Sequence, residues 1–146
     1  MGNVQFPGSD GRLVIVAARG LGRAFLRTFE RVALDSGTVC GRAARSGKPV
    51  FVSDVRLDAD FKAYVDFANS VPFRSVLSLP LMASAGEFVG MVSAHSAQAF
   101  APTALELKSG EIYARHLADE VVRLASASER AAYAERCSAE LMKITG

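Results

Sequence analysis

The sequence predicts an α/β fold of the α+β type, with a central antiparallel sheet of five to six strands flanked by helices and a long C-terminal helix. Three observations predict it. Residues 76–82 and 89–95 are β-rich runs separated by a polar, glycine-containing turn, which is the pattern of an antiparallel hairpin. A second pair of such runs lies near the N-terminus. From Pro102 to Thr145 the chain has helical character and no further proline.

The first hairpin joins residues 4–6 and 13–18 through the turn residues 7–11, which read Pro-Gly-Ser-Asp-Gly. From Gly22 onwards the apolar residues recur at spacings of three and four, which predicts a short amphipathic helix that ends near residues 35–37. The residues on its apolar side are Phe25, Leu26, Phe29, Val32 and Ala33.

The middle of the chain holds two further helices and one strand. Thr38 is placed to cap a helix of small residues, which ends where Gly47 accepts a left-handed conformation. Residues 49–52 have the composition of a strand, and residues 61–68 carry apolar side chains on one side of a third helix. Pro72 ends that helix.

The segment from Pro102 to Thr145 predicts a single helix of 44 residues, with proline in its favoured first turn. Such a helix is about 66 Å long, which exceeds the size of a small domain, so we expect its distal half to protrude or to pair. Its first half has an apolar face, whereas residues 125–139 are rich in Ala, Ser, Glu and Arg with weak heptads. The sequence therefore predicts a domain over residues 2–124 and a helical linker or coiled-coil stem over residues 125–146.

The composition excludes several classes of function. Half of the 146 residues are apolar and 22% are charged, as in a globular chain that buries a core. The net charge of +2 is spread along the sequence without a basic stripe, so we expect no nucleic acid as a partner. No apolar run is long enough to span a bilayer, so we expect no direct membrane contact. Cys40 and Cys137 lack the spacing of a disulfide framework or a zinc site, which favours a reducing, cytoplasmic setting.

Five stretches of the chain occur in the order and with the spacing of a known fold. They are GNVQ at residues 2–5, SGTVCGRA at 36–43, GKPVFVSDV at 47–55, SVLSLPL at 75–81 and VGMVS at 89–93. Over residues 2–124 the chain resembles a GAF domain, the small-molecule-sensing and dimerisation module of bacterial histidine kinases, nucleotide cyclases and transcription regulators. A GAF domain usually has a helix before its first strand, and this chain begins almost on that strand. Either the chain is a trimmed piece of a longer protein, or another chain covers that face of the sheet.

The resemblance implies a ligand pocket between the sheet and the helices and loops that cross one of its faces. On this sequence the pocket maps to Phe51, Asp54, Phe61, Tyr64, Phe67, Phe73, Ser75 and Leu77, with Cys40 nearby. Several aromatic side chains with a few polar groups suit a small organic ligand. They equally suit an ordinary core filled by its own side chains, and both interpretations stay open.

Other candidate residues are weighed against plain structural roles. Cys40, near a helix start, is a candidate thiol switch, but a free cysteine among small neighbours is more typical of close packing. His95 and His116 have no second metal ligand at a useful spacing. We interpret His95 as a strand-edge imidazole and His116 as a partly buried helical one, and we expect no metal and no cofactor.

The specialised branches of the family are not matched. The Cys-His pair that attaches bilins in phytochromes has no counterpart here, and the residues after Phe61 and Phe100 do not match the Asn-Lys-Phe-Asp-Glu set of cyclic-nucleotide-binding members. Free methionine sulfoxide reductases need clustered redox cysteines, whereas Cys40 and Cys137 are remote in sequence. No nucleophile elbow, phosphate-binding loop or His-Glu-x-x-His motif occurs, so we expect no enzymatic activity.

Taken together, these features predict a small-molecule-sensing and dimerisation domain of a bacterial signal-transduction protein, such as a two-component system. We expect an unidentified small organic ligand, a homodimer through the C-terminal helix, and relay of the ligand state through that helix to an output domain outside this chain. A ligand-free dimerisation or spacer module is the alternative. A thiol redox sensor at Cys40 is a more remote one.

Overall fold

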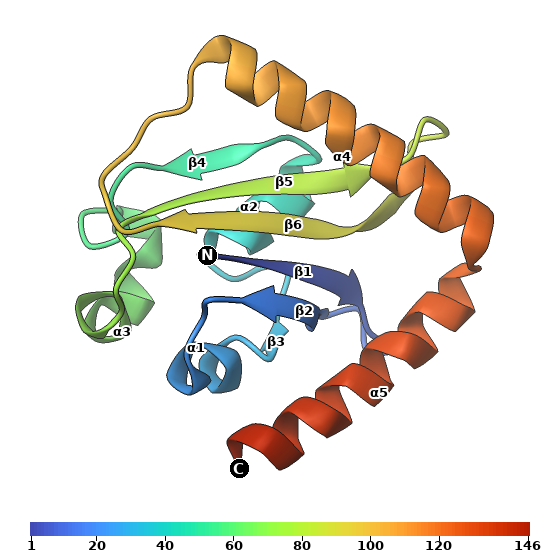
Figure 1. Ribbon diagram of the computed structural model, residues 1–146, viewed down its shortest axis with the longest axis horizontal. Coiled ribbons are helices and arrows are strands. Elements are labelled where there is room, and N and C mark those ends of the chain that lie inside the picture. The colour runs from blue at the N-terminus through green and yellow to red at the C-terminus, as the bar shows by residue number, and fades with distance from the viewer.

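A single six-stranded antiparallel sheet forms the centre of the computed structural model, which describes residues 1–146 (Figure 1). The strands follow the spatial order β3-β2-β1-β6-β5-β4, so the first strand lies in the middle of the sheet. They are β1 (Gly2–Pro7), β2 (Leu13–Arg19), β3 (Arg31–Val32), β4 (Val50–Val52), β5 (Ser75–Met82) and β6 (Phe88–Ser96). The predicted sheet of five to six antiparallel strands is confirmed.

Both predicted hairpins are present, and they join along the β1–β6 pair. In the first hairpin the register shifts between Val4 and Gln5, because Val16 of β2 is an extra residue in the pairing. In the second hairpin the amide of Ala83 donates to the carbonyl of Glu87 at 2.9 Å, which closes the turn. Gly86 in that turn has a φ of 88°, a left-handed conformation that glycine adopts without strain.

Short helices cover one face of the sheet, which we call the inner face. They are α1 (Arg23–Thr28), α2 (Val39–Ser46), the 3₁₀ helix η1 (Ala59–Tyr64) and α3 (Val65–Ser70), the last two dividing the predicted third helix. As predicted, the Thr38 side chain caps α2 by accepting from the amide of Gly41 at 3.1 Å, and Gly47 ends it with a φ of 63°. The main core lies between these helices and the sheet. Its larger side chains include Leu13, Phe25, Phe29, Phe61, Phe73 and Met91.

The helix predicted from Gly22 to residues 35–37 is wrong in its second half. The helix α1 ends at Thr28, and the strand β3 follows, with Val32 opposite Leu13 of β2. Without β3, the strand β2 would be the sheet edge and its outer backbone groups would lack partners. Val32 reaches the core from the strand, so the helical spacing of the apolar residues was misleading.

Two long helices lie on the opposite face, which we call the outer face (Figure 1). They are α4 (Ala104–Leu124) and α5 (Ala127–Thr145). The predicted single helix from Pro102 to Thr145 is wrong, because the backbone is extended at Ala125 and a new helix starts after Ser126. The Ser126 side chain accepts from the amide of Glu129, whose carboxylate accepts from the Ser126 amide, so a capping box defines the second start. Neither these helices nor the shorter ones are both long and apolar enough to cross a membrane.

The helix α5 turns back along β1 and β2 instead of protruding (Figure 1). Its buried residues are Arg130, Ala134, Ser138 and Thr145. The Arg130 guanidinium, 6% exposed, pairs with Glu87, and Glu135 pairs with Arg31. The outer face beside β1 and β2 is therefore covered by the chain's own helix α5, whereas coverage by another chain was one of the two alternatives that the sequence left open. The assignment of residues 125–146 to a linker or stem stays a prediction. The argument for it was a single helix too long for one domain, and that argument is wrong because the chain forms two helices.

Candidate functional site

A small cavity of ≈ 30 Å³ lies between the inner face of the sheet and the helices α1, α2 and η1. That volume holds about two water molecules. Side chains of the three central strands form its floor, aromatic rings form its roof, and the start of α2 forms one wall. The thirteen lining residues are Asn3, Gln5, Phe25, Phe29, Thr38, Val39, Cys40, Phe61, Phe73, Val76, Ser78, Ser93 and His95.

The floor is a polar patch at the centre of the sheet. Asn3 and Gln5 come from β1, Ser78 comes from β5, and Ser93 and His95 come from β6. Because side chains alternate between the two faces of a strand, residues two positions apart point to the same face. Asn3 lies opposite Ser93, which lies opposite Ser78. All five side chains are more than nine-tenths buried.

Three of these polar groups have no hydrogen-bond partner within the protein. They are Oδ1 of Asn3, Oε1 of Gln5 and Nδ1 of His95. An unsatisfied buried polar group costs about 1–3 kcal/mol, so native proteins keep few of them, and each one calls for an explanation. The fourth such atom in the protein is Nε of Arg42, whose terminal nitrogens pair with carboxylates. The unsatisfied groups are therefore concentrated in this cavity.

The imidazole of His95 is neutral at physiological pH. Burial, with a smaller contribution from the positive charge of the Met1 amino group, lowers its pKa to about 4. The Met1 amino group donates to the backbone carbonyl of His95 at 3.2 Å. The ring lies edge-on to Phe73 and Phe25, with centroid distances of 4.7 and 5.2 Å. His95 therefore offers a hydrogen-bonding nitrogen without a charge.

Four phenylalanine rings form the roof. Phe25 lies in α1, Phe29 ends that helix, Phe61 lies in η1, and Phe73 precedes β5. The ring centroid of Phe25 is 4.9 Å from that of Phe29 and 5.8 Å from that of Phe73. Phe29 stacks on Phe61 at 6.3 Å. A flat molecule in this cavity would have apolar rings above it and hydrogen-bonding groups below it.

The wall formed by the start of α2 contains the Cys40 thiol. The Thr38 hydroxyl is 2.7 Å from that of Ser36 and 3.4 Å from Sγ of Cys40. Burial raises the pKa of the Cys40 thiol, and the hydrogen bonds from Thr38 and Gly41 offset only part of this effect. The thiol is therefore protonated and weakly nucleophilic, which suits packing better than redox chemistry.

Comparison with known families identifies the chain. A family profile of the GAF domain matches residues 1–131. The chain belongs to the GAF domain family. Domains of this family are signalling sensor modules found in histidine kinases and other signalling proteins.

Solved structures share the fold of this GAF domain. The GAF domain region of a protein from Geobacter sulfurreducens PCA has a TM-score of 0.71 and 18% identity, over 85% of this chain and 81% of that chain. The GAF domain of a phosphoenolpyruvate-protein phosphotransferase from Coxiella burnetii has a TM-score of 0.68 and 20% identity, over 84% and 71%. A free methionine-R-sulfoxide reductase from Neisseria meningitidis, solved with its substrate, has a TM-score of 0.64 and 20% identity, over 92% and 68%. Among curated proteins, none matches this chain.

Some of the residues predicted for the pocket of this GAF domain do line the cavity. These are Cys40, Phe61 and Phe73. Tyr64 and Phe67 lie behind the roof, where their rings contact Phe29 at centroid distances of 5.3 and 5.1 Å. Both are partly buried and pack on the main core without lining the cavity.

Phe51 and Leu77 point to the outer face. They lie opposite each other in β4 and β5, and their neighbours Val52 and Val76 fill the inner core instead. The ring of Phe51 contacts that of Phe100, with centroids 6.4 Å apart. The structure therefore does not bring these two predicted residues to the cavity.

Asp54 and Ser75 have structural partners outside the cavity. The buried carboxylate of Asp54 accepts from Nε of Arg74 at 3.0 Å and from the amide of Arg56 at 3.1 Å, and the Arg74 guanidinium lowers the pKa of that carboxyl. The Ser75 hydroxyl donates to the carbonyl of Gln98 at 2.9 Å. Both residues connect the segments that flank β5.

The polar floor and the roof residues Phe25 and Phe29 were not predicted as site residues. A signal was present, because polar residues stand at alternate positions of otherwise apolar strands. His95, expected at a strand edge, lies in a central strand and is 8% exposed, so that expectation is wrong. His116, expected to be partly buried, is exposed on α4. No group of three or more His, Cys, Asp or Glu side chains is placed to hold a metal ion.

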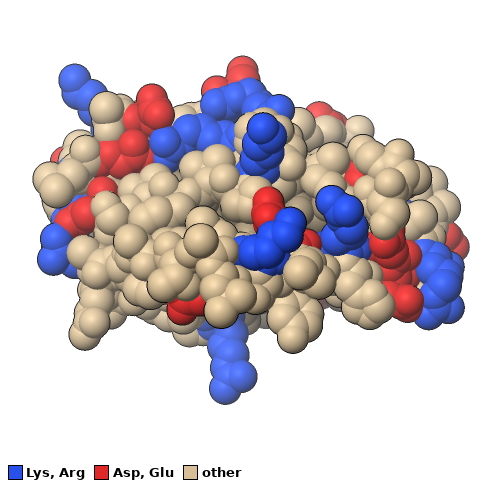
Figure 2. Space-filling view, turned by 90° about the horizontal axis from the view of Figure 1, so that it is seen from above, with Lys and Arg blue, Asp and Glu red and all other residues tan.

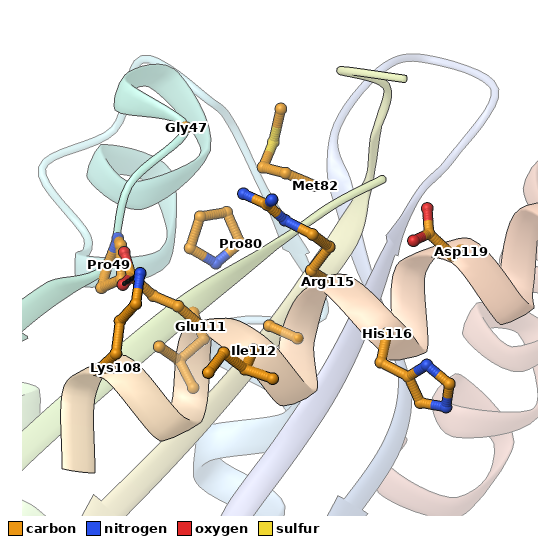
Figure 3. Close-up of a pocket in the computed structure, with 12 residues that line it drawn as sticks. Gly47, Pro49, Pro80, Met82, Lys108, Glu111, Ile112, Arg115, His116 and Asp119 are labelled. Atoms are coloured by element: carbon orange, nitrogen blue, oxygen red, sulfur yellow. Dashed lines mark ion pairs between the residues drawn. The ribbon is translucent and has the colours of Figure 1, made fainter. Parts of the chain in front are cut away.

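A larger groove of ≈ 360 Å³ opens on the outer face between α4, β5 and the turn after α2 (Figure 3). Lys108, Glu111, Arg115 and Asp119 of α4 line it. The pair of Lys108 and Glu111 is loose, at 3.9 Å, and Asp119 accepts from the amide of Ser84 at 2.7 Å. These charged side chains come from one helix and are mostly exposed. The groove is therefore a solvated helix flank, and the buried cavity is the better candidate site.

Proposed function

We propose that this GAF domain senses a small molecule that binds in the inner cavity. The observation that carries the proposal is the set of three buried polar atoms without partners around the cavity floor. A core packed only for stability is expected to hold apolar side chains at such positions, because each unsatisfied group costs about 1–3 kcal/mol. A bound ligand would supply the missing hydrogen bonds.

The alternative is a ligand-free dimerisation or spacer module. It requires a core in which side chains fill the space and every buried polar group has a hydrogen-bond partner. The aromatic roof meets this requirement, but the polar floor does not. A cavity of ≈ 30 Å³ is too small for an organic ligand, so binding requires the roof to open. The short helices η1 and α3 are the parts of the roof best suited to move, because a 3₁₀ helix has weaker hydrogen-bond geometry than an α-helix.

Catalysis is not part of the proposal. One structural relative is a free methionine-R-sulfoxide reductase. In this chain, however, Cys40 lies in α2 on the inner face and Cys137 lies in α5 on the outer face, so the two thiols are not clustered. Burial also raises the pKa of the Cys40 thiol, which disfavours the reactive thiolate. The same argument weighs against a thiol switch at Cys40.

We further propose that two copies of the domain associate through α4. Five large side chains form an exposed apolar stripe along this helix. They are Leu105, Ile112, Tyr113, Leu117 and Leu124, and at 100° per residue they fall within about 140° of arc. Figure 2 shows basic and acidic side chains interspersed on the side of the molecule that carries α4, with areas between them that carry neither. A second copy offers an identical stripe, as a two-fold dimer requires.

The relay would pass from the cavity floor through β5 to α4. Ser78 on the floor is followed by Leu79, whose side chain packs on the outer face. There α4 approaches the sheet closely, since a Cβ on Gly110 would lie 3.0 Å from Cδ1 of Leu79. A ligand that displaces β5 would therefore displace α4 as well. In the dimer, this movement would pass to an output domain of a parent signalling protein.

A thermal-shift screen with a metabolite library tests the sensor proposal. A ligand at a hundred times its dissociation constant adds about 2.7 kcal/mol to the free energy of unfolding. The matched control is Gln5→Met, which removes one free acceptor from the floor and keeps the length of the side chain. We expect at least one compound to stabilise the wild type and not the variant. Stabilisation of neither protein would support the spacer module, and stabilisation of both to the same extent would place binding away from Gln5.

A further inference from the structure

No charged side chain lines the inner cavity. None of its thirteen lining residues is Lys, Arg, Asp or Glu, and burial keeps His95 neutral. A charged ligand in this cavity would lose its hydration without gaining an ion pair. The cavity is therefore unsuited to carboxylates, phosphates and ammonium groups.

The free groups on the floor are spaced to contact one edge of a flat molecule. Asn3 and Gln5 lie two residues apart on the same side of β1, so their side chains start about 7 Å apart. His95 lies two residues beyond Ser93, which is the cross-strand partner of Asn3. Both carboxamide oxygens and Nδ1 of His95 lack a hydrogen-bond partner. A ligand that donates a hydrogen bond from its edge would satisfy one of the two oxygens.

We propose that the ligand is a small, uncharged, planar ring compound with a lactam-type edge, in which an N–H donor stands beside a carbonyl. This inference rests on the sensor function proposed above. A free carboxamide oxygen of Asn3 or Gln5 would accept from the N–H of this edge, and the NH₂ group of Asn3 would donate to its carbonyl. The rings of Phe25 and Phe73 would cover the faces of the ligand, where apolar contact is favourable.

The experiment compares three one-ring compounds. The compound 2-pyridone is an uncharged lactam, N-methyl-2-pyridone lacks its donor, and benzoate carries a negative charge. The protein has four carboxamide side chains, of which Asn3 and Gln5 lie in the cavity and Asn69 and Gln98 are exposed. Each gives its own NH₂ signal in nitrogen-edited NMR. The floor is thus observed directly, and the two exposed groups serve as internal controls.

We expect 2-pyridone to shift the signals of Asn3 and Gln5 and to leave those of Asn69 and Gln98 in place. N-methyl-2-pyridone should bind at least about ten-fold more weakly, because one hydrogen bond is lost, and benzoate should not bind at the floor. The variant Gln5→Met should also lose about ten-fold in affinity for 2-pyridone, whereas Gln98→Met should bind like the wild type.

Two results would overturn the inference. If benzoate or N-methyl-2-pyridone shifts the floor signals as strongly as 2-pyridone does, the cavity does not select uncharged donors, although it still binds ligands as a sensor would. If none of the three compounds shifts the floor signals, the lactam class is wrong. The library screen described above then decides separately whether the cavity binds any other molecule.

Discussion

Replacing Gln5 by methionine is expected to stabilise the unliganded protein. The side chain lies in a central strand, is 1% exposed, and has an Oε1 atom without a partner. Methionine has a similar length, is apolar, and adapts its shape to irregular gaps. The substitution therefore removes an unsatisfied group without opening a new cavity.

The expected magnitude follows from two opposing effects. Relief of the unsatisfied Oε1 is worth about 1–3 kcal/mol. The amide group of Gln5 also interacts with the Cys40 thiol, and loss of that contact costs about 0.5–1 kcal/mol. The free energy of unfolding should therefore rise by up to about 2.5 kcal/mol. For a chain of this size, the melting temperature should rise by up to roughly 8 °C.

Urea and thermal unfolding without ligand measure this effect, and Ser93→Ala is the matched control on the same floor. The Ser93 hydroxyl is bonded to that of Ser78 at 2.7 Å, so its removal leaves Ser78 unsatisfied. We expect Ser93→Ala to lower the free energy of unfolding by about 1–2 kcal/mol. If Gln5→Met lowers it by a similar amount, Gln5 is a satisfied structural residue and the reasoning about the cavity is refuted.

Three further predictions concern pH, the dimer and α5. The pKa of His95 is about 4 in the folded protein and about 6.5 in the unfolded chain. Between these pH values the unfolded state binds more protons than the folded state. The free energy of unfolding should therefore fall by on the order of 2–3 kcal/mol as the pH drops from 6.5 to 4. In urea unfolding as a function of pH, His95→Gln should flatten this slope and the exposed His116→Gln should not. Ile112→Glu and Met142→Glu each place a charge at a side chain that is 59% exposed, but only Ile112 lies in the α4 stripe. Only Ile112→Glu should give monomers in sedimentation velocity, and equal monomer fractions would contradict the α4 dimer. Arg130→Met should lower the free energy of unfolding by about 1–3 kcal/mol, which is less than the loss of a fully buried pair because the Glu87 carboxylate is partly exposed. The variant should also be cleaved faster by proteases between α4 and α5, and an unchanged rate of cleavage would contradict the packing of α5.

Much of the fold followed from signals between residues close in sequence. The β5–β6 turn around Gly86 and the helix between Thr38 and Gly47 are examples, because their geometry depends only on neighbouring residues. Competition between distant segments decided other elements. The edge strand at Arg31–Val32 forms because β2 has a free side, which no local pattern reveals. The capping box at Ser126 was readable, but the residues on both sides favour helix so strongly that the break was missed.

Less of the candidate site was predictable. The family resemblance located Cys40, Phe61 and Phe73, which do line the cavity. It failed for Phe51 and Leu77, because the face to which a strand residue points depends on the phase of the alternation. The polar floor depends on the pairing of β1 with β6, two strands far apart in sequence. Only the folded sheet brings their polar side chains together.

The presence of a small molecule in the inner cavity is tested most directly by native mass spectrometry of the wild type and of Gln5→Met, each purified gently from the source cells. We expect a wild-type dimer that carries an extra non-covalent mass, and a variant dimer that has lost most of it. A wild-type protein without extra mass, or an equal extra mass on both proteins, would contradict ligand binding on the cavity floor.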